Sequence, residues 1–387
     1  MKIPYFRFTA TGKELDYVKE VLESGWLTSS SKAAYLEESF SSYCEADYAL
    51  AVNSCTSALH LALESLGIKK GSKVLVPSWT FTASAEVIEY LGAEPIFCDV
   101  NYGSCSIDAE ILAEQIEKHP DLSALVLVHF GGQVAPITSK QGNGILNICR
   151  KHGVKIVNDA AHAFPASFEN KKIGSFGDIT CFSFYANKTI TCGEGGMIVT
   201  KDSGLYKRMK LMRLHGIDRD VWERFTSKTN QSDYDIVEAG FKYNLSDINA
   251  AVALAQFEIA EDLRSKRQKI AETYMEELQS LDSLDLPEIN VSHEEHSWHL
   301  FNPVLNTLSK ISRDELLIKL AENGIGTSIH YKPLHRMTFY KEKYDLKKED
   351  FPESESLWKG CFSLPIFPDL QESELEYIID TLKEILR

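Results

Sequence analysis

Residues 183–200 read SFYANKTITCGEGGMIVT and place one lysine, Lys188, between two apolar runs. The run CFSFY ends just before this lysine and the run GGMIVT follows it, so we predict two strands joined by a turn that carries Lys188. A lysine in a half-buried turn has its ammonium form disfavoured by desolvation, which leaves a nucleophilic amine able to form a Schiff base. For this residue alone a solvated turn lysine is the commoner interpretation, because most lysines are exposed.

Short apolar runs also recur along the preceding part of the chain. They lie at residues 48–52, 73–77, 95–100, 122–130 and 154–157 and indicate buried strands, with helical segments such as 57–66 between several of them. Strands and helices that alternate in this way predict an α/β fold, with a mainly parallel sheet covered by helices on both faces.

The chain is long enough for a large domain and a smaller one, which we expect at residues 1–255, including an N-terminal segment, and at 256–387. From Ser246 the pattern becomes one long helix with a capping serine and an acidic first turn, SDINAAVALAQFEIAEDLRSKRQKIAETYMEEL, which we expect to join the two domains. The smaller domain mixes short strands and helices. It ends in ESELEYIIDTLKEIL, whose buried face is expected to carry Leu375, Ile378, Ile379, Leu382 and Ile385.

At the N-terminus, Thr11 and Glu14 form a capping-box pattern that opens an amphipathic helix. The apolar face of that helix is expected to carry Leu15, Val18 and Leu22.

The composition excludes several classes of protein. The formal net charge of −15 argues against a nucleic-acid-binding surface, which needs clustered Lys and Arg. The eight cysteines are scattered without a C-x-x-C pair, so neither a disulfide framework nor a zinc site is indicated. No stretch approaches the roughly 20 apolar residues of a membrane span, and the N-terminus lacks the apolar core of a signal peptide. We therefore expect a cytoplasmic protein that does not enter the membrane.

Three further features lie where predicted strands end. After 48–52 the chain reads Asn53, Ser54, Cys55, Thr56 and Ser57 before a helix. N–H groups and hydroxyls at the start of a helix suit a phosphate, although plain helix capping is commoner.

Asp159, in KIVNDAAHA, lies where ligands bind in open α/β sheets. For a single Asp, a salt bridge or a helix cap is about as common as a functional role. In VPSWTFTASAE, Trp79 and Phe81 follow a strand and could cover a flat ring or pack in the core.

Together with Lys188, these features supply a phosphate site, a carboxylate, an amine and an aromatic face on loops of one sheet. Pyridoxal phosphate (PLP) needs this set. Nucleotide-binding patterns of the GxxxxGK[ST] and GxGxxG types are missing. The run HEEHSWH, with His293, His296 and His299, lacks the HExxH spacing, so we expect the start of a strand there rather than a metal site.

Ordered motifs along almost the whole chain resemble the DegT/StrS-type sugar aminotransferases of PLP fold type I. They are SGWLTS, VNSCTSALHLAL, PSWTF, VNDAAHA, SFYANKTITCGEGG, RLHG, GFKYNLSDINAA, SWHLF and SLPIFPD. The combination DAAHA, GFKYNLSDINAA and SWHLF most resembles the UDP-4-amino-4-deoxy-L-arabinose aminotransferase group. The resemblance implies transfer of an amino group from glutamate to a nucleotide-linked 4-keto sugar, giving a 4-amino sugar for surface polysaccharide or lipid modification.

Carried over residue by residue, the resemblance implies that Lys188 bonds covalently to the cofactor and that Asp159 pairs with the pyridine nitrogen. Phe81 would stack on the ring, and His162 would lie near the ring's 3-oxygen. The remaining cofactor contacts would be Cys55, Thr56, Ser57 and Ser183, joined at the phosphate by Asn244 of a second subunit. The resemblance thus implies a homodimer with a shared site. On the substrate side it points to Trp26, His330 and His335, although structural roles are nearly as common for these two histidines.

Two departures from the family pattern concern the subgroup more than the reaction. The family commonly has a Gly-Pro pair where this chain has Ser30, Ser31 and Lys32, which affects the expected substrate contacts of that loop. Many members also carry Gln at His162 and Arg at Asn244.

Four alternative functions remain open at this point. One is an aminotransferase that acts on a 3-keto sugar. Another is a PLP-dependent sugar dehydratase, which would share the scaffold but carry His in place of Lys188. A non-catalytic sugar-binding regulator could keep the fold without the chemistry. A Ser/His/Asp hydrolase is suggested by His129, but the chain has no G-x-S-x-G elbow.

Overall fold

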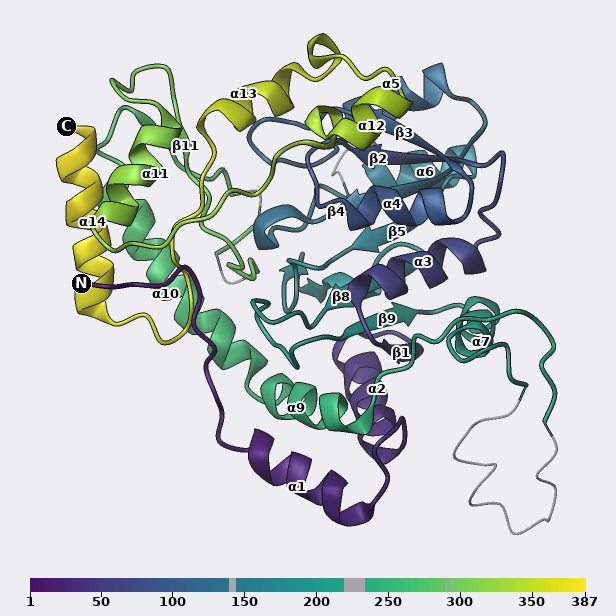
Figure 1. Cartoon of the computed structure of the whole chain (residues 1–387). Helices are drawn as coiled ribbons and strands as arrows, with labels where there is room; N and C mark the ends of the chain where they lie inside the picture. The colour runs from purple at the N-terminus through teal and green to yellow at the C-terminus, as the bar shows by residue number, and fades with distance from the viewer. Residues whose placement is uncertain (139–143, 219–233, 290, 294) are drawn as a thin grey trace.

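The computed structural model describes residues 1–138, 144–218, 234–289, 291–293 and 295–387. In these ranges a central sheet of seven strands has the order β1-β9-β8-β5-β4-β2-β3 (Figure 1). The strands are β1 Tyr48–Val52, β2 Lys73–Pro77, β3 Glu94–Cys98, β4 Leu122–Val128, β5 Lys155–Asp159, β8 Ile179–Ser183 and β9 Gly196–Thr200. Only β9 runs against its neighbours in this sheet, β1 and β8. The predicted mainly parallel α/β fold is confirmed, and residues 184–195 connect β8 to β9.

Helices cover both faces of the sheet because alternate strand residues point to opposite sides. Ala49, Ala51 and Leu75 belong to a core with α2, α5, α6 and α9, whereas Leu50, Val52 and Val74 belong to a core with α3, α4 and α7. The helices of the first core are α2 Ser31–Tyr43, α5 Ala109–Lys118, α6 Ile145–His152 and α9 Asp247–Phe257. Those of the second are α3 Cys55–Ser65, α4 Ala83–Tyr90 and α7 Ser203–Met212.

A third core forms the C-terminal part of the chain, seen in Figure 1 around α10, α11 and α14. Its elements are α10 Ala260–Leu278, β10 Leu284–Asp285, β11 Val304–Leu305, α11 Arg313–Glu322 and α14 Glu372–Leu386. The expected face of α14 is confirmed, with Leu375, Ile378, Ile379 and Leu382 buried and Ile385 partly buried.

Two segments pack in a core that is built mainly from the other part of the chain. Ile3 belongs to the third core and forms a parallel bridge with Ile325. Leu334 and Tyr340 belong instead to the core that contains α3 and α4. The division at residue 255 stays an interpretation of the sequence.

The remaining elements are α1 Glu14–Ser24, β6 Ser167–Phe168, β7 Lys171–Lys172, α12 Thr338–Lys343 and α13 Pro352–Gly360, with short 3-10 turns at Phe130–Gly132, Ile173–Ser175, Leu334–Arg336 and Lys348–Asp350. Within the described ranges no helix combines the length and the apolar character needed to cross a bilayer.

The prediction of a single long helix after Ser246 is wrong. Ser246 does cap a helix, by accepting a hydrogen bond from the Asn249 N–H, but the chain forms two helices that break at Glu258 and Ile259. The backbone of Ile259 leaves helical geometry, with φ −115° and ψ 18°. The first helix, α9, packs on the sheet, and the second, α10, belongs mainly to the third core, so the break lets each helix serve its own core.

The capping box expected at the first helix is confirmed only in its Glu14 half, and the expected apolar face does not pack into the core of a single chain. The helix begins at Glu14, with Lys13 in the cap position. Glu14 accepts hydrogen bonds from the Thr11 and Gly12 N–H groups and from Gln256 of α9, which turns its side of α1 inward. Leu15 and Leu22 consequently stay 81% and 57% exposed in a single chain.

Candidate active site

A cavity of about 380 Å³ lies at the carboxyl ends of the parallel strands, where ligands bind in open α/β sheets. The carboxyl ends of β1, β2, β4, β5 and β8 contribute residues to its wall, and the C-terminal part of the chain adds His330 and Tyr331. The lining includes Ser54, Cys55, Thr56, Thr80, Phe81, Val128, His129, Asp159, Ala161, His162, Ser183, Tyr185, Asn187, Lys188, Glu194, Gly195, His330 and Tyr331.

The N-terminus of α3 forms one end of the cavity. Ser54 caps this helix, and its hydroxyl accepts a hydrogen bond of 3.1 Å from the Ser57 N–H. Cys55 and Thr56 follow in the first turn, where N–H groups have no acceptor within the helix, and the helix dipole adds positive potential. This end is therefore suited to a phosphate group. Ser57 does not line the cavity, because its hydroxyl donates to Asn53 Oδ1 at 2.7 Å.

Gly196, the second of the two neighbouring glycines in the opening motif, allows β9 to approach this turn. A Cβ on Gly196 would stand 2.8 Å from the carbonyl carbon of Ser54 and 2.9 Å from the nitrogen of Cys55. Only glycine fits there without moving the start of α3. Ser183, at the end of β8, lies on the same wall, and its hydroxyl accepts the Tyr185 N–H at 3.3 Å.

Asp159 ends β5 and is 6% exposed. Its Oδ2 accepts a hydrogen bond of 2.7 Å from the Ser84 hydroxyl, and its Oδ1 accepts one of 3.1 Å from the Ala161 N–H. Burial raises the pKa of this carboxyl, although these hydrogen bonds and the charge of Lys188 act in the opposite direction. The carboxylate is thus held in a fixed orientation while its charge is only partly balanced, so a cationic ligand group would be stabilised there.

Lys188 lies in the turn between β8 and β9, and its N–H donates to the Tyr185 carbonyl at 2.9 Å. Burial lowers the pKa of its amine to about 8, against the opposing effects of Cys55 and Asp159. A substantial part of the amine is therefore neutral near pH 8, which is the nucleophilic form. The interpretation of Lys188 as a solvated turn lysine is wrong.

His162 pairs with a tyrosine from the C-terminal part of the chain. Its Nδ1 accepts the Gly131 N–H at 3.3 Å, and its Nε2 lies 2.8 Å from the Tyr331 hydroxyl. Burial lowers the pKa of His162, so the ring is neutral and carries its proton on Nε2, which donates to the tyrosine oxygen. The hydroxyl proton of Tyr331 is then available to another acceptor. His330 lies beside it, bonded to Ser363 Oγ at 2.9 Å, and burial lowers its pKa to about 4.

The structure brings most of the predicted site residues together around this cavity. They are Cys55, Thr56, Phe81, Asp159, His162, Ser183, Lys188 and His330. Phe81 is 57% exposed on the wall, whereas Trp79 is buried in a core. The individual roles carried over from the family stay predictions.

Four predicted residues lie outside the lining of the cavity. Ser57 lies beneath it, as described above. The indole N–H of Trp26 points to the Ser29 carbonyl at 3.5 Å, and Asn244 donates to Ser29 Oγ at 2.7 Å beside a separate surface hollow. His335 is buried against Ser78 and Glu355.

The sequence interpretation missed Ser84 and Tyr331. Ser84 lies on the first turn of α4, and Tyr331 directly follows His330 in SIHYKPLH. Adjacency to a predicted residue was the one local signal for Tyr331. Ser84 gave none, because a serine at the start of a helix is ordinary.

The loop that follows SGWLTS is fixed by a distant carboxylate. Asp247 accepts hydrogen bonds from the N–H groups of Ser30, Lys32 and Ala33 and so holds the start of α2. The departure from a Gly-Pro pair therefore coincides with a helix N-terminus capped from α9.

The described residues around HEEHSWH, 291–293 and 295–300, form no strand. The prediction that a strand begins there is therefore wrong. His296 packs against the ring of Trp298, with ring centres 4.1 Å apart. Among the described residues, no group of three or more His, Cys, Asp or Glu is arranged to hold a metal ion.

A model of the DegT/DnrJ/EryC1/StrS aminotransferase family matches residues 9–383. The chain belongs to this family. It is 37% identical over 385 residues to an uncharacterized protein of Methanocaldococcus jannaschii, covering 99% of this chain and 97% of that protein. It is 34% identical over 389 residues to the spore coat polysaccharide biosynthesis protein SpsC of Bacillus subtilis, with coverage of 100% and 97%. The solved PMP-form of the putative sugar aminotransferase Spr1654 from Streptococcus pneumoniae is 28% identical, with a TM-score of 0.88 and coverage of 100% and 98%.

The predictions of PLP fold type I, of PLP as cofactor and of an enzyme of the sugar aminotransferase family are confirmed. The residues of this aminotransferase also fit the cofactor. The start of α3 suits its phosphate, the buried carboxylate of Asp159 suits a protonated ring nitrogen, and Phe81 offers an aromatic face. Lys188 supplies an amine of lowered pKa within the same cavity.

Two alternatives lose their support in the structure. Lys188 occupies the position at which the dehydratases carry His. The imidazole of His129 accepts the Ala135 N–H on Nδ1 at 2.9 Å and pairs with Asn158 Oδ1 through Nε2 at 3.0 Å. Both of its nitrogens are thus engaged without a serine, and burial lowers its pKa to about 4, so it is a structural histidine.

We expect PLP uptake by the apoenzyme to speed up with rising pH and to level off above about pH 8, because the Lys188 amine reacts only when neutral. Below that pH each unit should lower the rate about tenfold. Stopped-flow absorbance measures the rate, and the reaction of PLP with a free lysine derivative in the same buffers corrects for the cofactor's own titration. A rise that continues to about pH 10, as for an ordinary lysine, would contradict the lowered pKa.

Proposed function

We propose that this aminotransferase moves an amino group from glutamate to the 4-keto group of a nucleotide-linked sugar and releases a 4-amino sugar. The observation that carries the proposal is the cavity itself, in which an amine of lowered pKa and a buried carboxylate lie at the carboxyl ends of one sheet. The motifs shared with the UDP-4-amino-4-deoxy-L-arabinose aminotransferase group support a 4-keto substrate. The name of SpsC, a spore coat polysaccharide biosynthesis protein, supports a product used in surface polysaccharide.

When bound, PLP supplies an electron-withdrawing ring that makes the carbon beside the transferred nitrogen acidic. The chain's own residues supply the rest. Lys188 Nζ, with a pKa of about 8, would take a proton from the carbon on one side of the transferred nitrogen and return one to the carbon on its other side. The carboxylate of Asp159 supplies a negative charge that would stabilise a protonated ring nitrogen, and a hydrogen bond from Ser84 fixes the orientation of this carboxylate. Neutral His162 and Tyr331 present hydrogen-bonding groups without adding charge near Lys188.

A coupled assay for 2-oxoglutarate formed from glutamate, run over a panel of UDP-, dTDP- and GDP-linked 4-keto sugars, tests the substrate. Turnover of at least one of these sugars is expected. Failure on the whole panel together with activity on a 3-keto sugar would overturn the assignment of the 4-keto position. Activity with another amino donor and none with glutamate would overturn the assignment of glutamate as the donor.

We also propose that the enzyme works in the cytoplasm. All eight of its cysteines are free and seven are buried, which suits a reducing compartment.

We further propose a homodimer in which each chain completes the other's site. Asn244 lies outside the cavity of its own chain, beside a hollow formed with Leu27 and Thr28. Exposed apolar side chains lie nearby in the sequence, at Leu15, Leu22 and Leu27, and on the wall of the cavity at Phe81 and Tyr185. A second copy that covers these side chains would bring its own Asn244 to the phosphate end of the cavity.

Co-expression of a Lys188→Ala chain with an Asn244→Asp chain tests the shared site. Each homodimer is expected to be nearly inactive, whereas half of the mixed population would be hybrid dimers with one intact site. The mixture should then show about a quarter of the wild-type activity per site. Tagging the two chains differently allows the hybrid to be purified and assayed. A hybrid without activity, while wild type passes the same purification, would contradict a shared site.

A further inference from the structure

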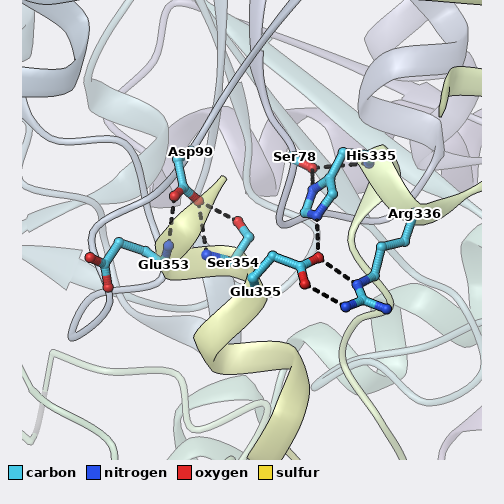
Figure 2. A network of polar contacts seen from close by, with 7 residues as sticks. All are labelled: Ser78, Asp99, His335, Arg336, Glu353, Ser354 and Glu355. Carbon is cyan, nitrogen blue, oxygen red and sulfur yellow. Dashed lines mark hydrogen bonds and ion pairs between the residues drawn. The ribbon is translucent and has the colours of Figure 1, made fainter. Parts of the chain in front are cut away.

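A buried polar network lies beside the cavity and links parts of the chain that are far apart in the sequence. Figure 2 shows Ser78 facing His335 and His335 facing Glu355, with Arg336 on the other side of the same carboxylate. Ser78 Oγ lies 2.7 Å from His335 Nδ1, and His335 Nε2 lies 2.7 Å from Glu355 Oε1. The Arg336 guanidinium bonds to both oxygens of Glu355. None of these four residues lines the cavity.

The protons in this network have one consistent arrangement. Burial acts to raise the pKa of Glu355, but hydrogen bonds from Arg336 and His335 outweigh it and lower the pKa to about 2. Glu355 is therefore ionised and accepts from His335 Nε2. Burial lowers the pKa of His335, against the opposing effect of Glu355, so the ring is neutral and its Nδ1 accepts the Ser78 hydroxyl proton.

This serine, histidine and carboxylate resemble a hydrolytic triad, but the serine is not a nucleophile. Ser78 is fully buried and lines none of the cavity. Its oxygen also accepts the His335 N–H at 3.1 Å, and its carbonyl accepts the Leu334 N–H at 2.8 Å. The hydroxyl and the carbonyl of Ser78 are thus engaged by residues 334–335, and its N–H donates to the Cys98 carbonyl at 2.8 Å, which indicates a structural task.

The network connects two segments that both line the cavity, where the rings of Phe81 and Tyr331 have centres 5.9 Å apart. Ser78 follows β2 and precedes Thr80 and Phe81, which line the cavity. His335 follows shortly after His330 and Tyr331, which line it from the C-terminal part of the chain. Glu355 belongs to α13, and the N-terminus of that helix is fastened separately, because Asp99 accepts the N–H groups of Glu353 and Ser354 at 2.7 and 2.9 Å (Figure 2).

We propose that Glu355 is a positioning residue of the active site, which acts through His335 and Ser78 to hold Tyr331 against His162. Glu355 orients the His335 ring, and the ring fixes the distance between the segment at Ser78 and the segment that carries Tyr331. The ring of His335 also stacks on Phe351, with centres 4.4 Å apart, which limits its rotation. The proposal does not depend on which sugar or amino donor the enzyme uses.

The test compares Glu355→Ala, Tyr331→Phe and the double variant, with no sugar present. The readouts are the dissociation constant of PLP from the apoenzyme and the visible circular dichroism of bound PLP, which reports the asymmetry around its ring. Glu355→Ala is expected to weaken PLP binding by on the order of tenfold and to change the dichroism, since a misplacement of about 1 Å is costly in such sites. In the Tyr331→Phe background the same substitution should have little further effect.

The control is Ser354→Ala. Ser354 lies on α13 beside Glu355, and the substitution removes its hydrogen bond to Asp99 while leaving Glu355 in place. It should leave both readouts within about twofold of wild type. Glu355→Gln keeps an acceptor oxygen for His335 and should recover most of the PLP affinity. The proposal would be overturned if Glu355→Ala weakened PLP binding equally in the wild-type and Tyr331→Phe backgrounds. An unchanged circular dichroism of bound PLP in Glu355→Ala would also overturn it. If Glu355→Ala does not fold, Ser78→Ala replaces it in the same cycle and decides in the same way.

Discussion

Replacement of Lys188 with alanine is expected to lower turnover by a factor on the order of 10⁴ or more. The amine at this position has a pKa lowered to about 8 by burial and lies in the cavity that holds Asp159 and His162. No other lysine lines that cavity among the described residues, so no neighbouring amine could replace it. Steady-state turnover with glutamate and a keto sugar measures the loss. The visible band of the cofactor in the purified protein should also change, because the covalent bond through Lys188 is gone.

Two control variants sharpen this result. Lys188→Arg keeps a positive charge but does not release a proton at neutral pH, so it should be about as inactive as alanine. Lys201→Ala removes an exposed lysine just after β9 and should retain full activity. Undiminished turnover in Lys188→Ala would refute the assigned role.

Replacement of Asp159 with asparagine is expected to lower kcat by on the order of 10² to 10³, the range seen when one preorganised electrostatic group is removed. Asparagine has nearly the same shape: its oxygen can still accept the Ala161 N–H, and its amide NH2 can donate to the Ser84 oxygen, so the loss would come mainly from the charge. Because Asp159 raises the pKa of Lys188, its removal should also shift the plateau of PLP uptake below about pH 8. Measurement of kcat and of the uptake profile checks both effects.

Stability separates this electrostatic effect from misfolding. Burial opposes the ionised form of Asp159, so Asp159→Asn should leave the melting temperature of the apoenzyme unchanged or raise it. Ser84→Ala removes one hydrogen bond to the same carboxylate and should cost roughly tenfold or less in kcat. A melting temperature lowered by many degrees, or a kcat for Asp159→Asn equal to that of Ser84→Ala, would contradict a role for the charge.

Much of the fold could be predicted because a parallel sheet buried on both faces leaves a simple local pattern. The runs 48–52 and 73–77 agree with β1 and β2 residue for residue. The same rule placed residues of the candidate site, since the ends of parallel strands meet at one edge and Asp159 and Ser183 end two of them. The buried face of α14 followed from its helical period.

Predictions failed where a contact between distant segments decided the outcome. The apolar face expected on α1 carries Leu15, Val18 and Leu22, but in a single chain Leu15 and Leu22 are exposed and Glu14, which accepts from Gln256, is buried instead. The helix after Ser246 breaks because its two halves belong to different cores. For His335 the sequence left a substrate contact and a structural role nearly equal, and the contacts of both ring nitrogens with Ser78 and Glu355 favour the structural role.

The sequence by itself determined the class of fold, the chemical groups of the cofactor site and the edge of the sheet at which they gather, because these follow from local periodicity and from the order of strands and loops. Only the tertiary structure decided which of those groups share one cavity, what burial does to the pKa values of Lys188 and Asp159, and that Tyr331 completes the wall. Those properties depend on side chains that approach from 75 to 257 positions away in the chain, as Ser84 approaches Asp159 and Ser78 approaches His335. Spacing along one sequence carries no record of such distances.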